Sequence, residues 1–389
     1  MSAASGPTTA RRLLALAAER PRAIATLEKR HGIWHPIAWA EHAAHVREAA
    51  SGLGTLGVGR GDRVAVIADN GPAWWIAELA AHCLGAAVVG IDPASADDAV
   101  LRALDLGEAR VAVVGDEATV DQLARIAGRL AAPPRVVSWS TALDHATRRT
   151  GEDATGRLTA WSDLVAAGRL DAAARPGWLD GEIAAGRADD LAVLCEPDTL
   201  DRGPLPLTHG QLFALAAQLE PVDRAADGRE VALVAAMPLA WIGEQMTSIA
   251  YALVHGTTVA FPEDAATTHA DLREIGPDLV LGPPRLWEHL RATVQRRTSD
   301  AGWLGRRTLA WALGVGAAVA EHRARGASPG PRLVAAHRIA DALALGAVRD
   351  HLGLSRAQRG YATGAPPPEV AQFFRAIGVE LVAVEAAAR

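Results

Sequence analysis

The strongest constraint on the fold is the regular alternation of short β-rich runs with helical segments. Residues 63–68 form a β-rich run, and residues 73–84 carry apolar side chains at the i, i+3, i+4 spacing of a helix. Similar pairs follow at 86–106, at 110–130 and, near the end of the chain, at 360–377. Repeated β-α units place strands side by side in parallel, so the pattern predicts an α/β fold of mostly parallel sheets covered by helices.

The alternation weakens once, in a segment rich in Gly, Asp and Arg. This interruption predicts two lobes and divides the chain into four parts. They are an N-terminal leader (1–22), a first α/β lobe (23–140), a connection (141–188) and a second α/β lobe (189–389).

Composition excludes several classes of protein. Half of the 389 residues are apolar, 22% are charged and the net charge is -6, which fits a globular protein and argues against a disordered chain or a nucleic-acid binder. No apolar run approaches the roughly 20 residues of a membrane span. Cys83 and Cys195 both lie in apolar surroundings, so we expect buried thiols and a cytoplasmic location.

Lysine is nearly absent. Of the 39 Lys and Arg residues only Lys29 is a lysine. Arginine does not replace lysine in catalysis, so a mechanism that needs a lysine must use Lys29.

Two apparent motifs have simpler explanations. Gly52, Gly54 and Gly57 match G-x-G-x-x-G, but they follow a helical run and precede a strand, the reverse of the dinucleotide-binding order. We therefore expect a helix-to-strand turn. His42 and His45 could share a helix face, but a zinc site needs a third ligand, so we predict no metal site there.

Several blocks occur in a characteristic order. They are 34–70, 85–95 (GAAVVGIDPAS), 237–244 (MPLAWIGE), 282–288 (GPPRLWE), 311–316 (WALGVG) and 364–374. Together they resemble the N-terminal part of the AMP-forming acyl-CoA synthetases of the long-chain fatty-acid type, from about Ala23 to the last residue.

The resemblance implies a fold, ligands and site residues. The fold is that of the acyl-adenylate-synthetase large domain, here without its β-barrel part and without the small C-terminal domain. The ligands are ATP with Mg²⁺, CoA and a fatty acyl group. The acyl-site candidates are Trp241, Gly282, Pro283 and Arg285, and the adenine-loop candidates are Thr363, Gly364, Ala365 and Pro366.

The family's phosphate loop, by contrast, is degenerate in this sequence. Its matching positions include Glu196, Thr199, Gly203, Leu205 and Thr208, and Leu205 stands where the family carries a lysine. Phosphate binding relies on backbone N–H groups and cations, whereas this loop has three prolines and three acidic residues.

The metal-binding signature also departs from the family. Ala388 stands at its Thr position and Arg389 at its Glu position, so we predict neither a metal ligand nor a catalytic residue.

These departures predict a long-chain acyl-CoA synthetase relative that is catalytically degenerate. It would keep the scaffold and either hold an acyl or nucleotide ligand or pair with a complete synthetase or with itself. Two alternatives remain open. One is an active acyl-CoA ligase or acyl-adenylating enzyme completed by a partner chain, and the other is a non-functional split-gene fragment.

Overall fold

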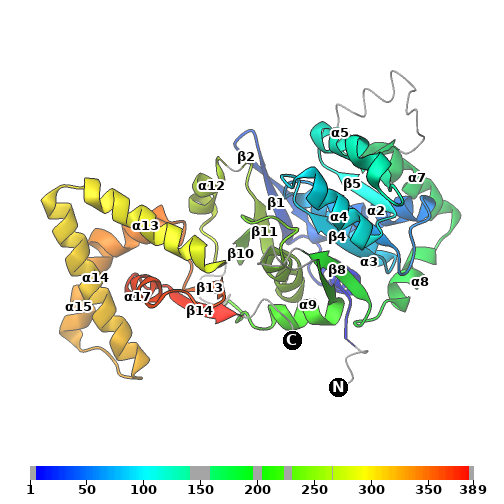
Figure 1. Ribbon diagram of the computed structural model, residues 1–389. Helices are drawn as coiled ribbons and strands as arrows, with labels where there is room; N and C mark the ends of the chain where they lie inside the picture. The colour runs from blue at the N-terminus through cyan, green and yellow to red at the C-terminus, as the bar shows by residue number, and fades with distance from the viewer. Residues whose placement is uncertain (1–5, 141–157, 196–203, 223–229, 265, 385–389) are drawn as a thin grey trace. The chain divides into compact units, whose positions relative to one another are not determined.

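The computed structural model describes residues 6–140, 158–195, 204–222, 230–264 and 266–384. The chain forms two compact units. Unit 1 comprises residues 1–28, 34–217 and 237–256, and unit 2 comprises residues 29–33, 218–236 and 257–389. Figure 1 shows the helices and strands of both units.

Unit 1 is built on a seven-stranded sheet with the order β7-β6-β5-β3-β4-β8-β9. Its strands are β3 (Arg63–Ile67), β4 (Ala87–Ile91), β5 (Val111–Val114), β6 (Arg135–Ser138), β7 (Leu158–Ala160), β8 (Leu191–Cys195) and β9 (Leu205–Thr208). All neighbours pair in parallel except β9, which runs antiparallel to β8. Central strands such as β4 and β5 are buried along their whole length, as expected for a sheet covered on both faces. The predicted α/β class is confirmed.

Helices surround this sheet. They are α1 (Thr9–Glu19), α2 (Trp39–Thr55), α3 (Pro72–Cys83), α4 (Asp97–Gly107), α5 (Glu117–Ile126), the 3₁₀ turn η2 (Ala127–Arg129), α7 (Trp161–Ala174), α8 (Trp178–Ala185), α9 (His209–Ala216), α10 (Ile242–Glu244), the π-helix η4 (Gln245–Tyr251) and α11 (Ala252–His255). Cys83 and Cys195 are buried free thiols, as the sequence predicted.

The G-x-G-x-x-G segment has a packing role. Gly52 and Gly54 lie inside α2, where a Cβ on Gly52 would collide with the backbone of Leu164 on α7. Gly57 has a φ of +83°, a conformation that favours glycine, and it follows the end of the helix. The predicted turn is therefore confined to Gly57. Gly52 lets α7 approach α2 closely, and Gly54 leaves room for the Trp178 ring of α8.

Unit 2 contains a parallel three-stranded sheet with the order β12-β13-β14. Its strands are β12 (Leu279–Gly282), β13 (Arg359–Thr363) and β14 (Glu380–Val384). A second sheet contains β10 (Ala232–Val234) and β11 (Thr258–Phe261). The hairpin strands β1 (Ile24–Arg30) and β2 (Ile33–Ala38) lie mostly in unit 1, and the hairpin tip, Lys29–Ile33, belongs to unit 2.

The helices of unit 2 form its outer layer. They are α12 (Thr268–Ile275), α13 (Pro284–Asp300), α14 (Trp303–Ala324), α15 (Pro331–Ala340), the π-helix η5 (Asp341–Leu345), α16 (Gly346–His351) and α17 (Pro368–Ala376). Their core centres on Trp287, Leu345 and Phe374, each fully buried. No helix among the described residues is long and apolar enough to cross a bilayer.

Candidate functional site

The carboxyl edge of the β12-β13-β14 sheet brings together two groups of predicted site residues. Gly282 ends β12 and is in register with Ala362, and Thr363 ends β13 in register with Val384. The backbone N–H of Gly364 donates to Val384 O over 3.2 Å. In open parallel sheets ligands bind outside the carboxyl ends of the strands, so this edge is the expected side for a ligand.

The adenine-loop candidates at this edge are open and incompletely bonded. Gly364 has a φ of +108°, and a Cβ there would meet only Pro284 Cγ, at 3.9 Å. Thr363 Oγ1 is buried and has no hydrogen-bond partner among the described residues. Buried polar atoms are nearly always paired, so this hydroxyl is a candidate contact for a ligand.

The acyl-site candidates on α13 are held by a neighbouring tryptophan. Pro283 precedes the first residue of α13, and Arg285 is exposed on its first turn. Trp287 is fully buried, donates its Nε1–H to Tyr361 O over 3.1 Å and meets the Phe374 ring edge-on at 5.1 Å. Trp287 therefore fixes α13 to β13, a role that the sequence did not reveal.

In unit 1 the described part of the predicted phosphate loop forms a β-strand and a helix cap. Leu205 lies on β9 opposite Cys195. Thr208 caps α9: its Oγ1 accepts from Gln211 N over 3.2 Å and its N–H donates to Gln211 Oε1 over 2.9 Å. This reciprocal capping box uses the backbone N–H and the hydroxyl oxygen of the threonine. Glu196, Thr199 and Gly203 lie outside the described residues, as do Ala388 and Arg389.

Trp241, also in unit 1, precedes a buried polar segment. Its ring lies against Gly243, where a Cβ would collide with it. Glu244 accepts hydrogen bonds from the backbone N–H of Met237 and from Ser248 Oγ. Burial raises the pKa of Glu244 to about 8.

A second buried carboxyl supports the same segment. Glu78 Oε2 accepts hydrogen bonds from Trp74 Nε1 and Gln245 Nε2, each at 2.9 Å. Burial raises the pKa of Glu78 to about 7, against those two hydrogen bonds. Sequence reasoning missed this pair. The only signal for Glu78 was a single acidic residue in an otherwise apolar helix.

Comparison with known proteins identifies the family. The model described as "AMP-binding enzyme" matches residues 14–195 and 205–384. The chain belongs to the AMP-binding enzyme family. The match confirms the resemblance found in the sequence. It is interrupted at 196–204, the greater part of the predicted phosphate loop.

Curated relatives of this AMP-binding chain include long-chain-fatty-acid–CoA ligases. The ACSBG2 ligase of Xenopus laevis is 24% identical over 366 residues, covering 92% of this chain and 47% of its own. The ACSBG2 ligase of Rattus norvegicus is 25% identical, covering 96% and 56% respectively. This chain thus spans about half the length of the curated relatives it matches.

Solved structures agree with the fold of the AMP-binding family. The N-terminal domain of FACL13 from Mycobacterium tuberculosis aligns with a TM-score of 0.62 and 17% identity, covering 97% of this chain and 75% of that one. The A domain of carboxylic acid reductase from Segniliparus rugosus, solved with AMP and a co-purified carboxylic acid, aligns with a TM-score of 0.66 and 18% identity. That match covers 97% of this chain and 60% of the reductase domain.

The single lysine of this family member is engaged in ion pairs. Lys29 Nζ lies 2.7 Å from Asp271 Oδ1 and 2.5 Å from Glu274 Oε2, all within unit 2. The hydrogen bonds to Asp271 and Glu274 raise its pKa. Burial pushes the pKa of Asp271 upward, but hydrogen bonds from Lys29 and Thr267 outweigh it and lower the pKa.

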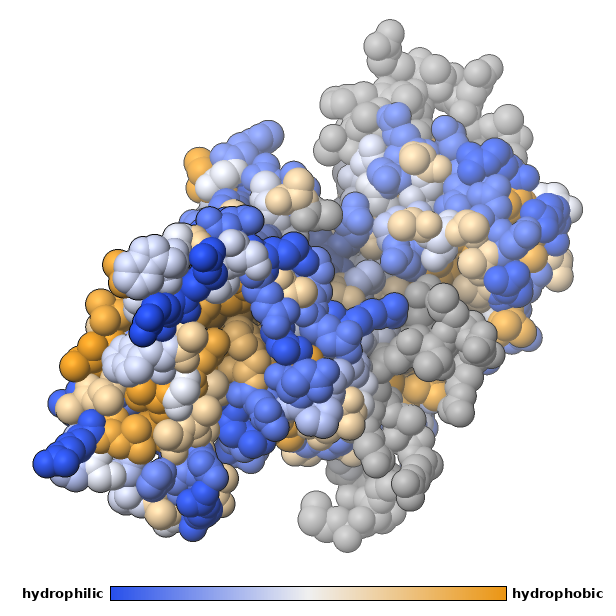
Figure 2. All heavy atoms as spheres, turned by 60° about the vertical axis from the view of Figure 1, so that its left-hand side comes forward, coloured by the Kyte–Doolittle hydropathy of each residue, from blue (hydrophilic) through white to orange (hydrophobic). Residues whose placement is uncertain are grey.

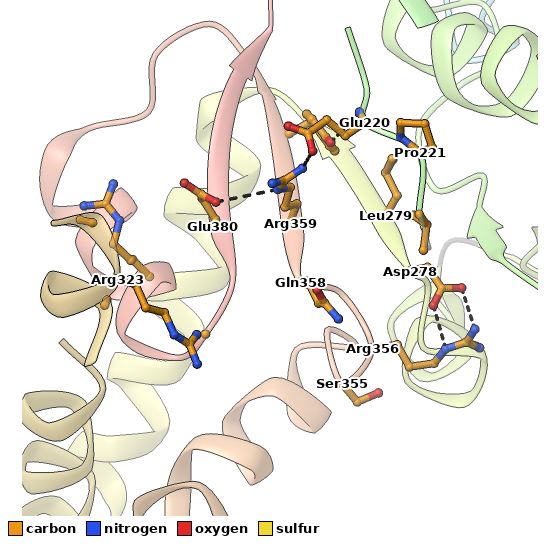
Figure 3. Close-up of a pocket in the computed structure, with 16 residues that line it drawn as sticks. Glu220, Pro221, Asp278, Leu279, Arg323, Ser355, Arg356, Gln358, Arg359 and Glu380 are labelled. Atoms are coloured by element: carbon orange, nitrogen blue, oxygen red, sulfur yellow. Dashed lines mark hydrogen bonds and ion pairs between the residues drawn. The ribbon is translucent and has the colours of Figure 1, made fainter. Parts of the chain in front are cut away.

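A cavity of unit 2 lies at the opposite, amino edge of the β12-β13-β14 sheet (Figure 3). It measures about 1140 Å³, and none of the predicted site residues lines it. Arg356 pairs with Asp278 at 2.6 Å, and Arg359 pairs with Glu220 and lies 3.8 Å from Glu380. This cavity is therefore separate from the candidate site.

Proposed function

We propose that this chain is a fatty acyl-CoA ligase-like protein that binds an acyl or acyl-adenylate ligand but does not catalyse adenylation. The ligand would lie at the carboxyl edge of β12, β13 and β14. The observation that carries the binding half of this proposal is Thr363 Oγ1, a buried hydroxyl without a partner among the described residues, beside the open Gly364.

The family supplies the chemical class of the ligand. The curated relatives are named as long-chain-fatty-acid–CoA ligases, and one structural neighbour was solved with AMP and a carboxylic acid. The acyl-site candidate Gly282 and the adenine-loop candidate Thr363 end neighbouring strands at this edge, as an acyl-adenylate would require, whereas the acyl-site candidate Trp241 belongs to unit 1.

The proposed loss of adenylation is supported by the residues that occupy the positions of the family's phosphate loop. The family match breaks at 196–204, and that segment contains three acidic residues, Glu196, Asp198 and Asp201, against one arginine, Arg202, and no lysine. These carboxylates would repel the phosphates of ATP. Leu205 offers no charge, and Pro206 has no N–H to donate.

Lys29 does not replace the lysine that the phosphate loop lacks. Its ammonium is held by two carboxylates of α12, and its side chain is only 12% exposed. Releasing it would leave Asp271, whose side chain is 1% exposed, without its counter-charge. ATP and Mg²⁺ therefore fit poorly as substrates of this chain, whereas an adenylate without a pyrophosphate group needs no such cation.

A pair of threonine variants tests the binding half. Thr363→Val removes the hydroxyl and keeps the shape, and Thr257→Val is the matched control, because Thr257 Oγ1 is also buried without a partner among the described residues. Binding of a non-hydrolysable long-chain acyl-adenylate analogue is measured by calorimetry. We expect Thr363→Val to weaken it about tenfold.

The control separates a ligand contact from a stability effect. Both variants should unfold at the same free energy as the wild-type chain or slightly above it, because an unpaired buried hydroxyl is removed. Thr257→Val should bind the analogue as tightly as the wild-type chain. A wild-type chain that does not bind the analogue, or two variants that weaken binding equally, would show that the edge is structural only.

Pairing with a complete synthetase or with a second copy remains a proposal. The competing possibility, a working ligase completed by a partner chain, predicts activity when that partner is added.

A further inference from the structure

The cavity at the amino edge of the β12-β13-β14 sheet is lined by more arginines than acidic residues. All of its lining residues belong to unit 2, and its volume of about 1140 Å³ has room for an organic molecule. Three acidic residues line it, together with four arginines: Arg323, Arg356, Arg359 and Arg375. The lining therefore carries an excess of positive charge, in a chain whose net charge is -6.

Two of the four arginines are paired with carboxylates. Arg356 bonds both carboxylate oxygens of Asp278, over 3.1 and 2.6 Å. Arg359 pairs with Glu220 and lies 3.8 Å from Glu380. Figure 3 shows these pairs as dashed lines. They use all three acidic residues of the lining, so no lining carboxylate remains for the other two arginines.

The remaining two arginines have no partner for their charge. Arg323 is on the last turn of α14 and Arg375 on the last turn of α17. Among the described residues neither guanidinium has a carboxylate within 4 Å or a hydrogen-bond acceptor. In Figure 3 Arg323 lies apart from the ion pairs of Arg356 and Arg359, and no dashed line reaches it.

Exposure of an arginine is not by itself evidence of a site. Hydrophilic side chains occur over much of the surface seen in Figure 2. Arg323 and Arg375 differ from other exposed arginines because they come from two helices and line one cavity whose carboxylates are already paired. An anion that enters this cavity would therefore meet two uncompensated cations.

A buried tyrosine adds a hydrogen-bond donor to the same lining. Tyr361 is 2% exposed, and its Oη accepts a hydrogen bond from Glu220 N over 3.0 Å. Its own O–H has no acceptor among the described residues. Burial raises the pKa of Tyr361 against the opposing effect of Arg359, so the phenol keeps its proton at neutral pH. A buried donor without an acceptor favours a ligand that supplies an oxygen atom.

We propose that this cavity binds a small organic anion that carries phosphate or carboxylate groups. Guanidinium groups suit both kinds of oxyanion, because their N–H groups can donate to two oxygens at once. Arg323 and Arg375 would hold the charged groups, and the Tyr361 hydroxyl would donate to a further oxygen. The site is separate from the carboxyl edge of the sheet, so the anion would bind independently of an acyl-adenylate.

Calorimetric titration of the full chain tests the proposal with two probes, inorganic phosphate and citrate. Ionic strength is held constant with sodium chloride, because salt screens exposed charges. We expect at least one probe to bind with a dissociation constant of about 1 mM or below. Binding of phosphate alone would assign the ligand to the organic phosphates, and binding of citrate alone would assign it to the carboxylates.

Two arginine pairs locate the site. Arg323→Gln with Arg375→Gln should weaken binding of the probe about tenfold. The control, Arg332→Gln with Arg338→Gln, removes the same charge from two exposed arginines of α15 that do not line the cavity, and should leave binding unchanged. Both double variants should bind the acyl-adenylate analogue like the wild-type chain, which separates this site from the proposed acyl-adenylate site.

A tyrosine variant tests the hydroxyl. Tyr361→Phe keeps the ring and removes the donor, so we expect about fivefold weaker binding of the probe. Circular dichroism melting confirms that each variant is folded.

Three results would overturn the proposal. The first is that neither probe binds the wild-type chain. The second is that the Arg323 and Arg375 substitutions leave binding unchanged, which would place the anion elsewhere on the chain. The third is that both arginine pairs weaken binding equally, which would show a response to net charge alone.

Discussion

The two regions that carry the predicted site residues use their polar atoms differently. At the carboxyl edge of β12-β13-β14 the Thr363 hydroxyl is left without a partner among the described residues, and Gly364 is open. In unit 1 Thr208 is occupied by a helix cap, and Glu244 and Glu78 are buried within hydrogen-bond networks. Glu78 Oε1 and Gln245 Oε1 of unit 1 are also without a partner among the described residues, but both side chains are fully buried, whereas Thr363 is followed by the open Gly364 at the carboxyl edge of a parallel sheet. We therefore expect the first region to bind the ligand.

Replacing Trp287, which supports the open edge of the β12-β13-β14 sheet, should change the free energy of unfolding more than any other single substitution proposed. Trp287→Ala leaves a cavity in the unit 2 core and removes the hydrogen bond to Tyr361 O, so we expect the free energy of unfolding to fall by about 3 to 5 kcal/mol. Trp303→Ala, at a tryptophan that is 66% exposed, is the control and should change little. Urea unfolding followed by circular dichroism measures both. Equal effects would contradict the assigned role of Trp287.

The buried carboxyls of unit 1 predict a dependence of stability on pH. Their raised pKa values, about 7 for Glu78 and about 8 for Glu244, mean that the folded state holds these protons more tightly than the unfolded chain. Their contribution to stability is full below the unfolded pKa near 4.5 and is lost as the pH rises through 7 and 8.

Each carboxyl should contribute on the order of 3 kcal/mol to this change. Glu78→Gln with Glu244→Gln should therefore flatten the decline of the unfolding free energy between about pH 5 and pH 8. The difference between wild type and variant isolates these two groups from the ion pairs of the surface. Parallel curves for the two proteins would show that the carboxyls are charged when folded.

Lys29 provides a smaller test. Lys29→Met leaves the buried Asp271 without its cation, so we expect a loss of about 2 to 3 kcal/mol in unfolding free energy. Lys29→Arg keeps a positive charge and should recover part of it. Binding of the acyl-adenylate analogue should be unchanged in both variants. Weaker analogue binding in Lys29→Met alone would mean that Lys29 acts on the ligand.

The cap at Thr208 should give the smallest effect. Thr208→Ala removes the hydroxyl that accepts from Gln211 N and should cost about 1 kcal/mol, whereas Thr208→Ser should cost little because it keeps the cap. Thermal unfolding compares the two. If alanine and serine behave alike, the hydroxyl is not needed for the cap.

Much of the architecture could be predicted because it depends on local patterns. Alternating periodicity indicated the parallel sheets, and the family resemblance of the blocks at 282–288 and 364–374 supplied acyl-site and adenine-loop candidates. Residues 158–185, where the sequence indicated only a connection, form β7, α7 and α8. Their Gly- and Asp-rich composition is typical of a loop, yet Gly168 of α7 packs directly against α2 at Glu48 and Gly52.

The buried network of unit 1 could not be predicted for a different reason. Glu78 and Gln245 are 167 residues apart, and nothing in either local sequence indicates the other. Trp287 lies in a recognised block, but its partners Tyr361 and Phe374 become visible only when α13, β13 and α17 are assembled. Long-range pairings of this kind depend on the fold itself.

The most direct test of the central claim is ATP–pyrophosphate exchange with a long-chain fatty acid and Mg²⁺, using a preparation that binds the acyl-adenylate analogue. Binding of the analogue shows that the protein is folded and its edge accessible. We predict exchange no greater than in the absence of protein. Exchange that requires both the fatty acid and Mg²⁺ would show that this chain adenylates its ligand and would contradict the proposal.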